Sequence, residues 1–460
     1  MISDEAISRL IDNGLIHALY VDMRIIHKDL VSVSFENGKN TGKECSKEYG
    51  ASIRVFTKNG IGYSSVSQIS EATLEEGIKK AVKIAQLTRK KVSSFTVGRN
   101  VKTLDWTHKL HPDPDEVIST VYEFVKSCDV PVIDADITEV LLCATSATHQ
   151  AVYTSEGSCI KSVVPHTLLT STSHLSSGKK MAFLIKESAG AAKMLHEIDN
   201  KIPDLIERVH EKVKTAYNAK KGILERSPAD VVLDSNAAGM ILHEAIGHSL
   251  EADAIVEGKS PFISDIERKV APDIVTIIDD ATTEEHFGSY PVDADGIMAE
   301  KKVLIRNGIL KKYLVDLECS IDLGLPPNGC GRVGGFSGFP IPRSSNISIE
   351  GGNWNNEEIL EESQGCIYIR TPSTAQISPD MTSFFIESYD AYILNKGSPD
   401  IIKNGIRVFF DTRSVLNKIT ALGDSVIFHP TVCVKERQMV PVSVGAPYMR
   451  LSNVQYLSSG

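Results

Sequence analysis

The strongest constraint on the fold is the clustering of short β-branched and aromatic runs around tight-turn signals. Asn59-Gly60 and Asn307-Gly308 each stand between two such runs. The flanking runs are 51–56, 61–63, 302–305 and 309–313. Asn-Gly between strand-like segments is typical of a hairpin, because both turn residues then adopt positive φ. We therefore expect antiparallel sheets rather than a doubly wound parallel sheet.

Helical periodicity is confined to a few segments. Helices are predicted at 3–13, 115–127 and 203–218, and after Thr73, where Glu76 closes a capping box. Further strands are predicted at 31–35, 140–144, 151–154, 181–185, 229–234, 274–278, 367–369, 383–386, 407–410 and 425–428. Because strands and helices occur in clusters, the pattern predicts an α+β fold.

The domain organisation follows from a change in composition. The chain has 460 residues, which is enough for two or three domains. The segment 220–228 is polar and contains a proline, so we place a boundary there. We expect an α+β N-terminal domain over 1–225, built from an antiparallel sheet and helices. A β-rich C-terminal domain over 226–460 is expected to carry one helix near its start.

Charge and hydropathy exclude several classes of protein. Lys plus Arg is 49 and Asp plus Glu is 59, which gives a net charge of −10. This balance argues against binding to nucleic acid or to an anionic membrane. No apolar run approaches the roughly 18 residues of a membrane span, and the first residues lack the pattern of a signal peptide. We therefore expect a cytoplasmic protein.

The motif that bears chemistry is His243-Glu244-Ala-Ile-Gly247-His248, in the expected helix. The HExxH motif of zinc peptidases places its histidines four residues apart, so both face one ion. Here they are five apart, which on a regular helix separates them by about 140°. A π-bulge restores a shared face by adding one residue to a turn, and a distortion at Gly247 is the other possibility. Two histidines satisfied within a core or an interface remain an equal alternative.

Several segments resemble the TldD/PmbA family, and its TldD branch in particular. The resemblance is strongest in the string 243–253. It extends to 231–234, 237–239, 275–280, 293–296, 304–310, Pro342-Arg343-Ser-Ser-Asn346 and the segment from Cys433 to Pro447. These segments occur in the family's order over most of 230–447, whereas the likeness over 1–225 is looser.

The resemblance implies a catalytic metallopeptidase. Its zinc ligands carry over to His243, His248 and Cys433, and its general base to Glu244. This singles out one of eight cysteines that otherwise form no CxxC pair and are expected to be buried and inert. Three protein ligands leave one position open for water, as a catalytic zinc site requires. The PmbA branch lacks these ligands.

The resemblance also implies a substrate and a partner. Family members act on small or unfolded polypeptides, and the peptide is thought to be held as an added strand. They pair with a homologous subunit, so we expect a homodimer or a heterodimer with a PmbA-like protein. Arg332 and Arg343 are candidates for binding the peptide, because a guanidinium offers paired donors, and a surface or structural ion pair is the favoured alternative. Glu251 is either an alternative ligand or a group that supports His248.

Two rival functions stay open at this stage. One is a non-catalytic peptide-binding or assembly subunit with a structural metal, which predicts a closed four-ligand site. The other is a regulatory protein that acts on DNA topology, against which the net charge of −10 counts.

Overall fold

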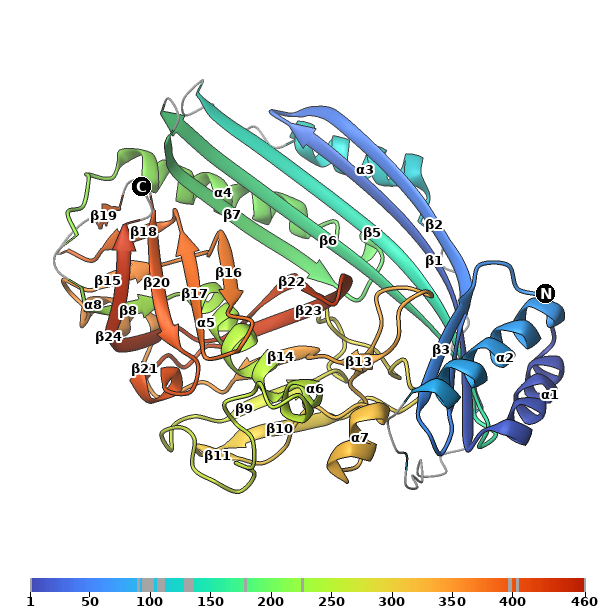
Figure 1. Ribbon diagram of the computed structural model, residues 1–460. Coiled ribbons are helices and arrows are strands. Elements are labelled where there is room, and N and C mark those ends of the chain that lie inside the picture. Colours follow the sequence, from blue (N-terminus) through green and yellow to red (C-terminus); the bar gives the residue numbers. More distant parts are fainter. Residues whose placement is uncertain are drawn as a thin grey trace.

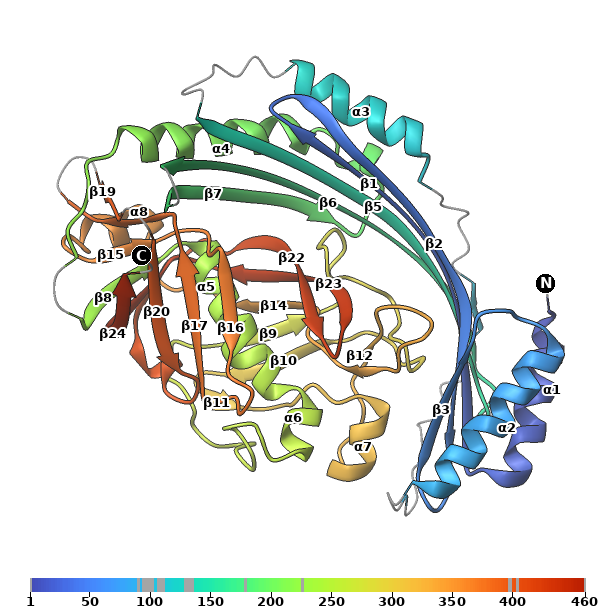
Figure 2. The same ribbon diagram turned by 45° about the horizontal axis from the view of Figure 1, so that its top comes forward.

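The computed structural model of the chain describes residues 2–88, 92, 103–105, 112–127, 136–177, 180–224, 227–395, 399–402 and 405–458. A long curved antiparallel sheet arches over a second body that contains two further large sheets (Figure 1, Figure 2). The predicted α+β fold is confirmed. Among the described helices, none is both long and apolar enough to cross a membrane.

The arching sheet is built from the first half of the chain. Its strands pair in the order β3-β2-β1-β5-β6-β4, and β7 also pairs with β6. The strands are β1 Tyr20–Glu36, β2 Lys39–Phe56, β3 Ile61–Val66, β4 Thr103–Asp105, β5 Ile137–Thr154, β6 Cys159–Ser177 and β7 Lys180–Ala191. Strands as long as the 19 residues of β6 accumulate twist along their length, which gives the sheet its curvature.

Two predictions for this sheet are corrected. The runs 140–144 and 151–154 are parts of one strand, β5, because the intervening hydroxyl-rich residues continue the ladder with β1 and β6. Asn59-Gly60 does connect β2 to β3, but neither residue has a positive φ. The Thr57 hydroxyl instead accepts hydrogen bonds from the amides of Asn59 and Gly60 in a longer loop.

Four helices cover parts of this sheet. They are α1 Asp4–Gly14, α2 Glu71–Leu87, α3 Pro114–Ser127 and α4 Lys201–Asn218, so the predicted helices are confirmed. α3 and α4 lie on the convex side (Figure 2). The capping box of α2 is corrected, because Ser70 is the N-cap and Glu76 is not part of the box. The Ser70 hydroxyl accepts from the amide of Thr73, and the Thr73 hydroxyl accepts from the amide of Ser70.

The second body contains a six-stranded and a nine-stranded sheet. The first has the order β11-β10-β9-β14-β23-β22, and the second has β16-β17-β20-β24-β8-β15-β18-β19 with β21 paired to β24. The strands of the first are β9 Ile277–Asp280, β10 Lys301–Arg306, β11 Ile309–Leu310, β14 Asn346–Ile349, β22 Ile427–Lys435 and β23 Gln438–Ala446. Those of the second are β8 Ala229–Leu233, β15 Ile367–Ile369, β16 Thr374–Ile377, β17 Ser383–Ser388, β18 Ala391–Ile393, β19 Asp400–Ile401, β20 Ile406–Asp411, β21 Ile419–Leu422 and β24 Met449–Ser458.

Shorter elements complete this body. They are the helices α5 Ser235–Ile241, α6 Ala252–Val256, α7 Leu317–Leu323 and α8 Asn356–Glu361, and the pair β12 Gly331–Arg332 and β13 Ile341–Pro342. The runs predicted at 274–278, 309–313 and 425–428 are shifted or shortened to β9, β11 and β22. Asn307-Gly308 forms the predicted tight hairpin, with φ values of 47° and 76°. The domain boundary stays a prediction, and residues 225 and 226 lie outside the described residues.

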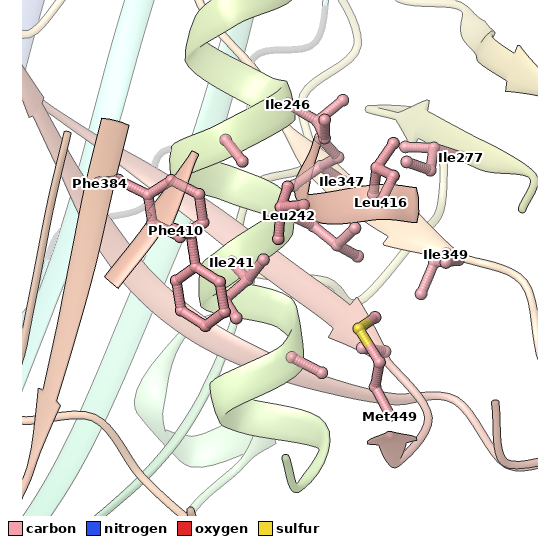
Figure 3. Packing of buried hydrophobic residues seen from close by; sticks show 14 of the residues in the cluster. Ile241, Leu242, Ile246, Ile277, Ile347, Ile349, Phe384, Phe410, Leu416 and Met449 are labelled. Carbon is pink, nitrogen blue, oxygen red and sulfur yellow. The ribbon is translucent and has the colours of Figure 1, made fainter. Parts of the chain in front are cut away.

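The helix that carries the motif is buried between the two sheets of the second body. Ile241, Leu242 and Ile246 pack against strands of both sheets, among them Ile347 of β14 and Phe384 of β17 (Figure 3). The first three side chains are at most 1% exposed, and burying such a side chain contributes about 1.5–3 kcal/mol. This packing fixes the position of the motif in the molecule.

Candidate metal centre

The helix begins directly after a central strand. β8 ends at Leu233, and the carboxylate of Asp234 then accepts a hydrogen bond of 2.9 Å from the amide of Ala237. A capping aspartate satisfies one of the free amides at a helix start, so Asp234 defines where α5 begins. The motif follows directly after α5 in the same helical segment.

A π-helical turn spans Leu242–Gly247 and contains all of the motif except His248. A π-turn holds one more residue than an α-turn, so residues five apart come to lie above one another. The rings of His243 and His248 are 4.7 Å apart between centroids. Gly247 keeps helical dihedrals, with φ −51° and ψ −64°. Of the two alternatives, the π-bulge is therefore confirmed.

Cys433 reaches the two histidines from the edge strand β22. Its Sγ atom lies 3.5 Å from Nε2 of His248. One potential ligand atom from each of the three side chains falls within 4.8 Å of the others, and all three residues are buried. Within the described part of the chain, this is the one cluster of three or more His, Cys, Asp or Glu residues that could hold a metal ion.

Both imidazole rings are oriented through their Nδ1 atoms. Nδ1 of His243 lies 3.2 Å from the hydroxyl of Ser344, and Nδ1 of His248 lies 3.0 Å from Oε2 of Glu251. Nζ of Lys435 lies 2.6 Å from the same Glu251 oxygen. Such contacts fix the tautomer and the direction of the remaining nitrogen. Glu251 therefore orients the His248 ring and is not part of the three-residue cluster.

The charges of these groups depend on one another. Burial alone raises the pKa of the Cys433 thiol, but the imidazoles of His243 and His248 outweigh it and hold that pKa well below its usual value. For His248, burial by itself lowers the pKa, but the charges of Glu251 and Cys433 outweigh burial and raise that pKa well above its ordinary value. The cluster thus favours a thiolate, which is the form of cysteine that binds metals. Two imidazoles and a thiolate fit a zinc ion.

The cluster opens into a cleft of 490 Å³. Glu244 is half-buried and lines this cleft beside His243 and His248. Among the described residues, the Glu244 carboxylate makes no hydrogen bond or ion pair with the protein. The cleft is also lined by Ala375, Gln376 and Ile377 of β16 and by residues 431–435 of β22. Each strand lies at the edge of its own sheet.

The two candidate arginines lie outside this cleft. Arg343 is fully buried, and its Nη2 atom donates to the carbonyl of Cys433 over 2.9 Å. Its Nη1 atom donates to the carbonyl of Gln438 over 3.4 Å, so Arg343 holds the hairpin that carries Cys433. Arg332 donates to the carbonyl of Ser344 over 2.9 Å and stacks on Tyr290. Neither arginine lines the cleft, although Arg343 supports the hairpin that does.

Sequence reasoning assigned no role to Ser344, Lys435 or Gln438. Their positions in family-like segments could have indicated a role. Ser344 lies within the Pro-Arg-Ser-Ser-Asn segment, and Lys435 and Gln438 lie within the segment that follows Cys433. Gln438 accepts from the amide of Gly334 and donates to the carbonyl of Phe339, which joins the hairpin to the glycine-rich loop 334–338. The sequence alone did not reveal these contacts, because the partners are 99 to 184 residues away along the chain.

Comparisons with known proteins identify the family of the chain. Residues 226–458 match the family described as "PmbA/TldA metallopeptidase C-terminal domain", and residues 21–85 match "PmbA/TldA metallopeptidase domain 1". The chain therefore belongs to the PmbA/TldD metallopeptidase family. The resemblance seen in the sequence is confirmed at the level of the family.

Relatives with full-length and partial similarity carry peptidase names. "Metalloprotease MJ0996" of Methanocaldococcus jannaschii is 26% identical over 454 residues, which are 98% of this chain and 99% of that protein. "Metalloprotease TldD homolog" of Buchnera aphidicola is 34% identical over 226 residues, 49% of this chain and 47% of that protein. A relative in Saccharolobus solfataricus is named a zinc metalloprotease and is 24% identical over 416 residues, 88% of this chain and 89% of that protein.

Solved structures share the fold. TldE from Thermococcus kodakarensis superposes with a TM-score of 0.78 at 16% identity, covering 98% of this chain and 99% of that one. A putative modulator of a DNA gyrase from Thermotoga maritima gives 0.76 at 16% identity, covering 99% of this chain and all of that one. At these identities the likeness concerns the fold alone.

Proposed function

We propose that the chain is a zinc-dependent peptidase of the TldD-like catalytic branch. In this proposal His243, His248 and Cys433 bind the zinc ion and Glu244 is the general base. The observation that carries it is the π-turn, which gathers both histidines beside Cys433 while Glu244 remains in the cleft. The names of the relatives support peptide-bond hydrolysis.

The proposed role of each residue follows from the position of its side chain. A zinc ion held by the three ligands supplies Lewis-acid activation of a water molecule and of the scissile carbonyl. Glu244 takes a proton from the attacking water and delivers it to the leaving amine nitrogen. The Glu244 carboxylate has no ion-pair partner among the described residues, so it is available to contact a water molecule in the cleft. Ser344 and Glu251 hold the imidazoles in orientation.

The substrates proposed are small or unfolded polypeptides. The edge strands β16 and β22 both line the cleft, and each has one edge without a strand partner among the described residues. A peptide that adds to either edge is held mainly by main-chain hydrogen bonds, which need an extended chain and little sequence specificity. Most strands of a folded protein are already paired within a sheet, so an unfolded chain offers its main-chain groups more readily. Peptides N-methylated at alternate amides should therefore show a higher KM than unmethylated peptides with the same side chains.

A closed structural metal site, the alternative function, requires a fourth protein ligand. The cluster in the described residues holds three, and it borders a cleft. This favours an open catalytic position over a structural one. A role in DNA topology gains no support from the likeness to the Thermotoga protein, because 16% identity shows a shared fold only.

We also propose that the chain works as a homodimer or with a PmbA-like subunit, as the resemblance implies. Fold similarity to TldE is consistent with a homologous partner. Light scattering of the purified chain separates a homodimer from a monomer that awaits a second subunit.

The proposed function is tested by Glu244→Gln, with Glu257→Gln as the matched control. Both glutamates line the cleft, but Glu257 is paired with Lys259 at its rim. We expect Glu244→Gln to bind zinc normally and to lose at least about a hundredfold in kcat on an unstructured peptide mixture, within the range of general-base catalysis. The control should keep its activity. Equal activity of Glu244→Gln and wild type contradicts the assignment.

A further inference from the structure

A second pocket lies between the arching sheet and the second body. It has a volume of 100 Å³ and is bordered by β1, β5 and β6 on one side. The segment 332–335 and residues 439–441 of β23 form the other side. β22, which carries Cys433, and β23 form one hairpin. β22 lines the metal cleft, and β23 lines this second pocket.

Three nitrogen-bearing side chains from separate elements line this pocket. Lys28 comes from β1, His166 from β6 and Arg332 from β12. Arg332 is 8% exposed, whereas Lys28 and His166 are half-buried. The hydroxyl-bearing Thr148 and Ser162 complete the polar lining.

Two of these three groups keep unused hydrogen-bonding capacity among the described residues. Among the described residues, the Lys28 ammonium makes no hydrogen bond or ion pair, and Nε2 of His166 is buried without a hydrogen-bond partner. Glu48 pairs with Lys28 in the β1–β2 register, but Oε1 of Glu48 accepts from the amide of Phe336. Asp293 also lines the pocket, but its two oxygens accept the amides of Asp295, Ile297 and Gly331.

A cation that is removed from water is stable only when an anion or a set of acceptors compensates it. Burial lowers the pKa of Lys28, and only Glu48 opposes this shift. Burial and the charges of Arg332 and Lys28 together lower the pKa of His166 to about 3. Among the described residues, the Lys28 ammonium therefore contacts no carboxylate and Nε2 of the neutral His166 has no hydrogen-bond partner, whereas Arg332 keeps its contacts with the Ser344 carbonyl and the Tyr290 ring. An anion in the pocket would complete the contacts of Lys28 and His166.

We propose that Lys28, His166 and Arg332 bind a small oxyanion, either a carboxylate or a phosphate. The pocket is large enough for such a group, and the guanidinium of Arg332 and the ammonium of Lys28 donate charge-assisted hydrogen bonds to its oxygens. The hydroxyls of Thr148 and Ser162 are further donors. Arg332 also contacts the carbonyl of Ser344, whose hydroxyl contacts His243, so the anion site lies two contacts from the proposed metal centre.

Calorimetric titration of the metal-free full chain with inorganic phosphate tests the proposal independently of any peptidase activity. We expect saturable binding to wild type and at least about tenfold weaker binding to Lys28→Gln, since a charge-assisted contact is lost. Lys39→Gln, which removes an exposed lysine at the other end of the β1–β2 pair, should bind as wild type does. His166→Gln is a second variant in case Lys28→Gln fails to fold, and it should also weaken binding.

A second titration identifies the source of the oxyanion. It compares a short peptide that has a free C-terminal carboxylate with the same peptide amidated. Tighter binding of the free acid, lost in Lys28→Gln, supports a carboxylate ligand, and binding of phosphate alone supports a phosphate. Absence of binding by both probes, or equal binding to wild type, Lys28→Gln and His166→Gln, overturns the proposal.

Discussion

Oε2 of Glu251 lies 3.0 Å from Nδ1 of His248, and neither side chain is accessible enough to exchange this contact for water. The contact joins the candidate ligand to an ion pair with Lys435, a residue of the strand that carries Cys433. His248 and Cys433 are 185 residues apart in the sequence. The buried Glu251 carboxylate therefore links the segments that carry them, in addition to the metal that they are proposed to share.

Removing the Glu251 charge should weaken metal binding without removing a ligand. We expect Glu251→Gln to lower zinc affinity by about 10–100-fold, because groups that orient ligating histidines have effects of this size. Competition with a chromophoric chelator measures the change. Glu257→Gln, at the rim of the same cleft, is the control and should bind zinc as wild type does. Equal losses in both variants would show that cleft charge, rather than the orientation of His248, sets the affinity.

Two glycines of the motif helix should respond differently to alanine. A Cβ at Gly247 meets its nearest neighbour, Ile347, at 3.5 Å, which is ordinary contact. A Cβ at Gly239 meets Val444 of β23 at 2.9 Å. Gly239→Ala should therefore lower the free energy of unfolding by about 1–3 kcal/mol through overpacking, while Gly247→Ala should leave it unchanged or raise it by up to about 1 kcal/mol.

Urea unfolding of both variants and zinc titration of Gly247→Ala provide the test. Retained zinc binding in Gly247→Ala is expected, because the π-turn needs no glycine at this position. A Gly247→Ala protein that is folded but binds no zinc would show that a distortion at Gly247 is required after all.

The cap of the motif helix should make stability depend on pH. Burial raises the pKa of Asp234 from 3.8 to about 6, although Lys212 opposes the shift. The pKa of Asp234 is higher in the folded than in the unfolded protein, so protonation of this carboxyl stabilises the fold. This stabilisation is fully present below pH 3.8 and is lost as the pH rises through about 6. Asn also caps helices but carries no charge. Asp234→Asn should thus be more stable than wild type at pH 8, and this advantage should shrink by on the order of 2 kcal/mol at pH 4.5.

Unfolding by urea at several pH values between about 4.5 and 8 measures both free energies. A difference between Asp234→Asn and wild type that stays constant over this range would show that Asp234 does not titrate as its burial implies.

The sequence predicted the local features of the fold better than its long-range pairings. Asn307-Gly308 forms the expected tight turn, but Asn37-Gly38 between β1 and β2 has the same signal and the same positive φ values, and the hairpin there was not predicted. Strand β6 was missed because its hydroxyl-rich residues and Pro165 break the alternation that identifies a strand. Its stability comes from pairing with β5 and β7, which a local pattern does not contain.

The candidate site was predictable in composition but only partly in geometry. The spacing of His243 and His248 allowed a π-turn without requiring it, because the choice depends on how Ile241, Leu242 and Ile246 pack between two sheets. Cys433 entered only through the resemblance to the family, since nothing near it in the sequence distinguishes it from other buried cysteines. The contact between Glu251 and Lys435 could be identified only from the fold.

The most direct test of the central claim is X-ray absorption spectroscopy at the zinc edge, on the zinc-loaded wild type and on Cys433→Ser. We predict one sulfur ligand at about 2.3 Å and two imidazole nitrogens at about 2.0–2.1 Å in wild type, with the sulfur contribution absent from the variant. A wild-type spectrum with only nitrogen and oxygen ligands, or one that Cys433→Ser leaves unchanged, would contradict the assignment of His243, His248 and Cys433 as the metal centre.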